Sequence, residues 1–167
     1  MASSGTSPGV GGDARFCGAW QLVSFTEREP LPDGGEAVRH PYGADARGYI
    51  VYTPCGVVSY QLCAGAGSRP RFSSGDFMRG TPAELAAAAS TFRSYVARWR
   101  ADAAAGVVTH DVELSFHPDR ESVRLRRRYA FSADGDELEL VPLAADGGGA
   151  ASAGGKREAL VWRRVRC

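Results

Sequence analysis

Two neighbouring stretches of the chain combine strand-like alternation with charged side chains on their apolar faces. In residues 107–116, His110 shares a face with four apolar residues, Val108, Val112, Leu114 and Phe116. In residues 123–131, Arg127 shares a face with Val123, Leu125, Tyr129 and Phe131. Side chains two residues apart in a strand point to the same side of the sheet. Because burying a bare imidazole or guanidinium is costly, these faces predict a barrel with a polar cavity inside it.

Length and charge limit the classes of protein to which the chain can belong. With 167 residues and 44% hydrophobic residues, it is long enough to form one domain with a sizeable core. The formal net charge of +1 gives no global field for nucleic acid or an acidic membrane. Arg124, Arg126 and Arg128 would share one strand face, which we interpret as solvated. No apolar stretch is long enough for a transmembrane helix.

The first residues are rich in Gly and Ser and lack the apolar segment of a signal peptide. We therefore expect a disordered tail over residues 1–15, a single domain over residues 16–167, and a cytoplasmic location. The four cysteines, Cys17, Cys55, Cys63 and Cys167, have no zinc-site spacing. We expect them to be reduced thiols.

The sequence pattern of the predicted domain indicates about eight strands and one helix. Thr81 and Glu84 form a capping box with Pro82 at the first helical position. A buried helical stripe is expected, with Leu85, Ala88, Ala89, Phe92 and Val96 as its members. The predicted strands are 19–26, 48–53, 56–62, 95–101, 107–116, 122–131, 137–141 and 157–164, and the predicted long loops are 27–47, 64–80 and 144–155.

The fold class is therefore mainly β, with one inserted α-helix. Strands at this spacing, joined mostly by turns, indicate an antiparallel up-and-down barrel or a sandwich. A barrel of about eight strands has room for one small ligand.

Several short segments resemble the small stand-alone lipocalin-like domain family of bacteria and fungi. The first is Gly18-Ala19-Trp20, which looks like the Gly-x-Trp opening of lipocalin-type barrels. The others are 45–50, 52–54, 71–72, 80–82, 108–110 and 161–163, so the resemblance extends from Cys17 to Arg164. It departs from the family at Asp111, where a second histidine is common, and in the longer loop 144–155.

The resemblance implies a closed antiparallel barrel with an internal cavity. It also implies that Trp20 plugs the closed end and packs near a late basic residue, either Arg163 or Arg164. Some small barrel proteins of similar architecture act as cyclases or isomerases in natural-product biosynthesis, which is an analogy of fold alone. Alternation places Asp111 on the outer face, so we do not pair it with His110.

Three residues are candidate catalytic groups: His110, Arg127 and Tyr129. His110 is either a general acid or base or a core histidine bonded to Tyr95 or a backbone carbonyl. Arg127 either binds an enolate, carboxylate or phenolate or pairs with an acidic residue at the rim. Tyr129 and Tyr95 either donate to a ligand carbonyl or are structural aromatics.

The candidate ligand-binding residues are Tyr60, Tyr95, Trp99, Phe116, Ser59 and Gln61. The facing of strand 56–62 is open in the sequence. Either Val58, Tyr60 and Leu62 point inward, or Val57, Ser59 and Gln61 do.

Nucleotide, phosphate-loop, hydrolase-elbow and metal motifs are absent from the sequence. We therefore expect no cofactor and no metal. Two functions remain. The first is a cofactor-free cyclase or isomerase acting on a small apolar oxygenated metabolite of polyketide or terpenoid type. The second is a carrier of such a molecule. The expected partner is that small hydrophobic metabolite, with no nucleic acid and no membrane, and the protein is expected to be a monomer or a homodimer.

Overall fold

The computed structural model describes residues 12–143 and 156–166. The predicted loop 144–155, the first 11 residues of the predicted tail and Cys167 lie outside them. In the described part, nine antiparallel strands form one sheet in the order β2-β1-β3-β4-β5-β6-β7-β8-β9. Their bounds are β1 Gly18–Pro30, β2 Glu36–Arg39, β3 Arg47–Tyr52, β4 Val57–Cys63, β5 Phe92–Asp102, β6 Val107–Ser115, β7 Arg124–Phe131, β8 Glu137–Pro142 and β9 Arg157–Arg164.

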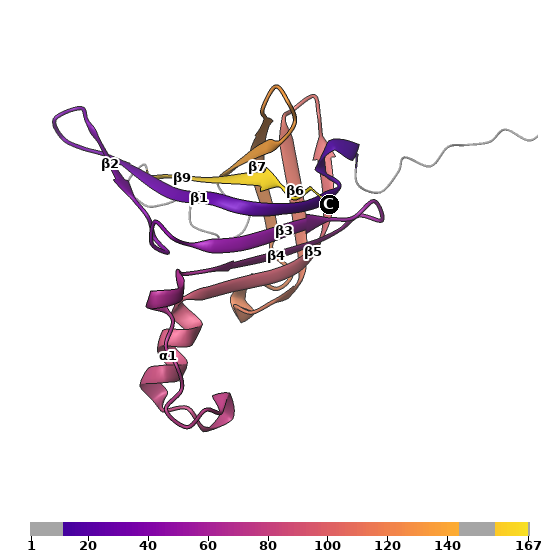
Figure 1. Cartoon of the computed structure of the whole chain (residues 1–167). Helices are drawn as coiled ribbons and strands as arrows, with labels where there is room; N and C mark the ends of the chain where they lie inside the picture. Colours follow the sequence, from indigo (N-terminus) through magenta and orange to yellow (C-terminus); the bar gives the residue numbers. More distant parts are fainter. Residues whose placement is uncertain (1–11, 144–155, 167) are drawn as a thin grey trace, which may run out of the picture.

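Pairing between β1 and β9 closes the sheet into a barrel. Eight strands, β1 and β3–β9, make the closed barrel, and β2 pairs only with the outer half of β1. The predicted antiparallel barrel with one inserted helix is confirmed. Figure 1 shows the β1–β2 hairpin extending beyond the barrel wall.

The prediction of a long loop over residues 27–47 is wrong at its start. β1 continues to Pro30 and pairs with β2. Ion pairs support this hairpin: Arg39 lies 3.5 Å from Glu29, and Lys156 of the β9 side lies 3.3 Å from Glu27. Charged side chains suit a solvated sheet edge, although they lower the apparent strand propensity of the segment.

The helix α1, Pro82–Ser90, has the predicted capping box between Thr81 and Glu84. The predicted buried stripe is wrong, because Ala88 is the one buried residue of this helix. Phe92 and Val96, two members of the predicted stripe, belong to β5. Figure 1 shows α1 standing off the barrel near the start of β5.

A bulge in β6 changes which side chains face the core. Val112 pairs with Ala97 and Leu114 pairs with Val96, so Glu113 is an extra residue between them. The extra residue turns Leu114 outward, where it is 63% exposed. The predicted inward position of Leu114 and of Phe116 is therefore wrong, because one bulge residue shifts the alternation by one.

Aromatic side chains fill one end of the barrel. Ala14–Phe16 forms a short 3-10 helix, η1, that places Phe16 in the core. The ring of Phe16 lies 5.0 Å from that of Tyr52, 5.4 Å from that of Trp99 and 4.8 Å from that of Tyr129. Residues 14 and 15, which were predicted to belong to the tail, are thus part of the structure that closes this end.

Trp20 belongs to the same closed end, as the resemblance implied. Its indole N–H donates to the carbonyl of Phe16 at 2.8 Å. The guanidinium of Arg164 lies 4.0 Å above the Trp20 ring and donates to the carbonyls of Arg15 and Cys17. Of the two predicted partners, Arg164 packs on Trp20, while Arg163 forms an ion pair with Glu137.

Candidate functional site

A cavity of about 190 Å³ occupies the other half of the barrel. Five strands, namely β4, β5, β7, β8 and β9, contribute most of its wall. Phe25 of β1, Ile50 of β3, and Arg120 and Leu143, which lie outside the strands, also line it. Leu140, Leu160 and Trp162 provide apolar surface. Arg127 and Tyr95 add polar groups to the same wall. An apolar cavity with a few convergent polar groups is the usual form of a small-molecule site.

His110 lies behind this wall, at the centre of a buried polar cluster. The imidazole is fully buried, and its Nε2 lies 3.0 Å from the hydroxyl of Tyr52. Its Nδ1 lies 2.9 Å from the hydroxyl of Tyr95 and 3.0 Å from Nη1 of Arg127. The contact with Tyr95 is the one expected if His110 is a core histidine. His110 itself does not line the cavity.

The contact with Arg127 determines the tautomer of the imidazole. A guanidinium only donates hydrogen bonds, so Nδ1 of His110 accepts and carries no proton. The proton therefore lies on Nε2, which donates to the hydroxyl oxygen of Tyr52. Nδ1 has one lone pair, for which the Arg127 N–H and the Tyr95 O–H compete. When Arg127 takes it, the Tyr95 proton is available to another acceptor.

Burial keeps the members of this cluster other than Arg127 neutral. Burial, assisted by the positive charge of Arg127, holds the pKa of His110 well below its ordinary value. Burial also raises the pKa of Tyr52 and of Tyr95, against the opposing effect of Arg127. At neutral pH the cluster is a cationic guanidinium surrounded by an uncharged imidazole and uncharged phenols.

Two predicted ligand-binding residues lie in the cavity and one lies elsewhere in the core. Tyr60 and Tyr95 line the cavity with their rings stacked at 4.8 Å. Trp99 is buried at the closed end, where its indole N–H donates to the carbonyl of Thr53 at 3.0 Å. Tyr129, predicted as catalytic, packs on Phe16 at that end and does not line the cavity.

The remaining predicted ligand-binding residues lie on the outside of the barrel. Val58, Tyr60 and Leu62 are buried, which settles the facing of β4. Ser59 and Gln61 therefore point outward, where the Gln61 amide donates to Ser59 at 2.7 Å. Phe116 is 46% exposed and packs on Phe92. The prediction that these three residues line the cavity is wrong.

The cavity lining includes several residues that were not among the predicted site residues. Arg126, which was interpreted as part of a solvated face, is one of them. Arg93, Arg120, Glu158 and Trp162 are others. Alternation along β9 places Glu158, Leu160 and Trp162 on one face, so the pattern contained a signal for two of them. Arg93 precedes the stretch that was recognised as β5, and Arg120 lies in the 3-10 turn η4, Pro118–Arg120. For these two arginines, only the tertiary fold brings the side chains to the cavity.

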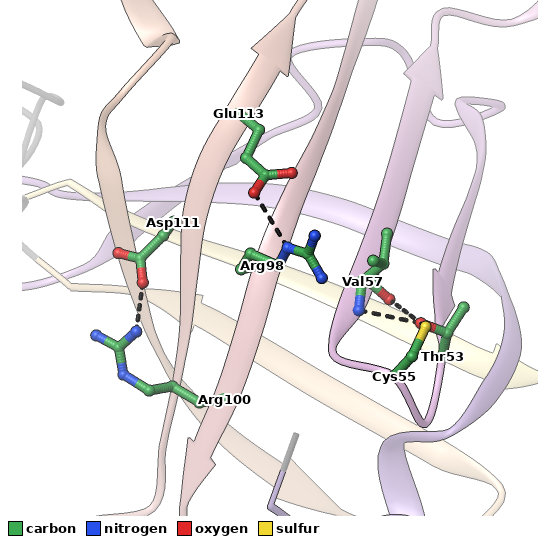
Figure 2. Close-up of polar contacts among 7 residues, drawn as sticks. All are labelled: Thr53, Cys55, Val57, Arg98, Arg100, Asp111 and Glu113. Atoms are coloured by element: carbon green, nitrogen blue, oxygen red, sulfur yellow. Dashed lines mark hydrogen bonds and ion pairs between the residues drawn. The ribbon is translucent and has the colours of Figure 1, made fainter. Parts of the chain in front are cut away.

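The outer face of β5 and β6 carries ion pairs (Figure 2). Arg98 lies 3.1 Å from Glu113, and Asp111 pairs with Arg100 and with Arg124. This confirms the outward position of Asp111. Figure 2 also shows Cys55 beside Thr53 in the β3–β4 turn, with its sulfur 3.1 Å from the Thr53 hydroxyl.

The closed antiparallel barrel, the aromatic plug with Arg164 on Trp20, and the internal cavity define a lipocalin-type small-molecule-binding barrel. The chain belongs to the lipocalin-like domain family, whose model matches residues 17–165. A comparison with curated proteins gives no match.

Two further observations concern the described residues alone. No three His, Cys, Asp or Glu side chains among them gather as a metal site would require. No helix among them has the length and apolar character needed to cross a membrane.

Proposed function

We propose that the protein is a cofactor-free cyclase or isomerase that acts on a small apolar metabolite containing a carbonyl group, of polyketide or terpenoid type. The observation that carries the proposal is the convergence of Arg127 and Tyr95 on one cavity wall, both backed by neutral His110. The apolar body of the substrate lies against Leu140, Leu160 and Trp162. Its carbonyl oxygen lies against Arg127 and Tyr95.

In this arrangement the protein stabilises negative charge on the substrate oxygen. Loss of a proton from the carbon beside the carbonyl gives an enolate, and fixed donors aimed at such charge stabilise it strongly. The enolate carbon then attacks a second carbonyl of the same molecule, or it is protonated at another carbon. A water molecule in the cavity takes the proton from the carbon. In cyclisation, the new alkoxide takes a proton from Tyr95, which regains one from the protonated water. In isomerisation, the protonated water returns its proton to the other carbon. Substrate and product are isomers, so no co-reactant is needed.

His110 acts as a positioning residue in this proposal. Its Nδ1 accepts from Arg127 or Tyr95 and so fixes where both groups point. A buried wall also holds a flexible substrate in a reactive conformation, which lowers the barrier through orientation.

A second candidate function is a carrier that binds such a molecule without changing it. The shielding of His110 from the cavity favours this candidate, because no imidazole is in reach of a bound molecule. A carrier needs only apolar walls and a few orienting groups.

Mass spectrometry separates the two functions. The protein is incubated with a metabolite extract from cells that lack its gene, beside the variants Tyr95→Phe and Arg127→Met. As a matched control we choose Arg98→Met, which removes an arginine from the outer face of β5. Conversion of a compound into an isomer of the same mass by the native protein and the control, but not by the two site variants, supports the enzyme. Retention and unchanged release by all four proteins contradicts it and supports the carrier.

A further inference from the structure

Arg127 is a buried cation without a buried counter-charge. Its side chain lies in the core, with the residue 8% exposed. In the described part of the chain, no carboxylate lies within ion-pair distance of it. Its polar partners are His110 and Tyr95, which are both uncharged at neutral pH. Burying a charge is costly unless an opposite charge accompanies it, so this site has a strong preference for an anion.

The other charged residues of the cavity lining also favour an anion. Arg93 and Arg120 line the cavity, and neither has an ion pair with a described residue. Glu158 is the single carboxylate among the described residues that line the cavity. An anion inside the cavity would therefore meet several positive charges and one negative charge.

Trp162 contributes apolar surface to the same cavity. Its indole ring lines the cavity. The indole nitrogen has no accessible surface and no hydrogen-bond acceptor among the described residues, so it does not point into the cavity. Arg127 is therefore the group that gives the cavity its preference for an anion.

We propose that the cavity binds its ligand as an oxyanion, the ionised form of an acidic enol or phenol, with Arg127 as the counter-charge. This inference rests on the proposed function, because the enolate formed from the proposed substrate has the same kind of negatively charged oxygen. The ligand loses its O–H proton to water on binding, and no bond to carbon changes. A cation within about 4–6 Å lowers the pKa of an acid by about 1–3 units.

The test uses 4-nitrophenol, whose phenolate is read by its visible absorbance, and 4-nitroanisole, which has the same ring but cannot ionise. Absorbance titrations at several pH values give the pKa of bound 4-nitrophenol. We expect the wild-type protein to lower this pKa by about 1–3 units, which means that the phenolate binds at least about tenfold more tightly than the phenol. 4-Nitroanisole should bind with an affinity close to that of the neutral phenol.

Variants assign the effect to Arg127. Arg127→Met should abolish the pKa shift and leave the binding of 4-nitroanisole intact. Arg98→Met, on the outer face, should behave as the wild type. Because Arg127→Met also changes the core, Arg127→Lys provides a second variant that keeps the positive charge and should retain part of the shift.

The outcomes are distinct. Binding of both probes with no change in the pKa of 4-nitrophenol overturns the oxyanion inference and leaves a small-molecule cavity in place. A shift that persists in Arg127→Met overturns the role of Arg127. Failure of both probes to bind overturns the inference together with the cavity on which the proposed function depends.

Discussion

The neutral burial of His110 predicts that the protein loses stability as the pH falls below about 6.5. The unfolded chain takes up a proton on this imidazole near the ordinary histidine pKa of about 6.5. The folded protein does so only at much lower pH, because burial and Arg127 lower the pKa of His110. Below about pH 6.5 the unfolded state therefore binds more protons than the folded state, and the free energy of unfolding decreases.

The size of this loss in the free energy of unfolding follows from the single proton that His110 takes up and from the histidine pKa in the unfolded chain. Between pH 7.5 and pH 5.5 the expected loss is about 1.4 kcal/mol, the value for a group that stays neutral in the folded state over this range. No acidic residue counters it, because the polar contacts of His110 are Tyr52, Tyr95 and Arg127. Carboxylates with lowered pKa values, such as Glu84 at about 2, contribute below this pH range, near the unfolded carboxylate pKa of about 4.

Urea unfolding at the two pH values, followed by tryptophan fluorescence, measures this loss. The variant His110→Gln should be less stable at pH 7.5, because it leaves buried hydroxyls imperfectly paired, but its stability should change little between the two pH values. The matched control is His117→Gln, since His117 is exposed; it should retain the full pH dependence. Equal losses in the wild type and in His110→Gln would refute the neutral, buried imidazole.

Three further predictions concern the rest of the molecule. Arg164→Met should lower the free energy of unfolding by about 2 kcal/mol, because it removes a cation over Trp20 and three hydrogen bonds to carbonyls. Arg163→Met, which removes an exposed ion pair, should cost less than about 1 kcal/mol in the same urea titration. Thr81→Ala should destabilise α1 by about 1 kcal/mol, seen as faster amide exchange in the helix, and an equal shift of the whole barrel would contradict the separate position of α1. Glu158→Gln should tighten the binding of 4-nitrophenolate in an absorbance titration, since it removes the negative charge from the lining; weaker binding would show that the carboxylate helps to hold the anion.

Alternation was a reliable guide where strands are regular. Along β5 and β7 it correctly placed Tyr95 and Arg127 inside the barrel, because each strand keeps its period across the cavity. It failed for Leu114 and Phe116, since the bulge at Glu113 is an irregularity of pairing with β5. A bulge depends on the neighbouring strand and leaves no mark in the alternation of its own sequence.

The facing of β4 shows a different limit. Both of its faces contain residues that could line a polar cavity, so the sequence left Ser59 and Tyr60 as alternatives. The register with β3 and β5 decides between them, because Tyr60 is paired with Ile50 and Tyr95. Likewise, the position of Arg120 depends on the packing of η4, which no local pattern encodes.

The aromatic plug around Phe16 has a consequence for exchange of the bound molecule. In the described part of the chain, this plug closes one end, and the cavity lies in the other half of the barrel. A molecule must then leave by the passage through which it entered. Narrowing that passage raises one barrier that both directions share. Association and dissociation should slow by the same factor, so the residence time of the ligand can be lengthened while its equilibrium affinity stays constant.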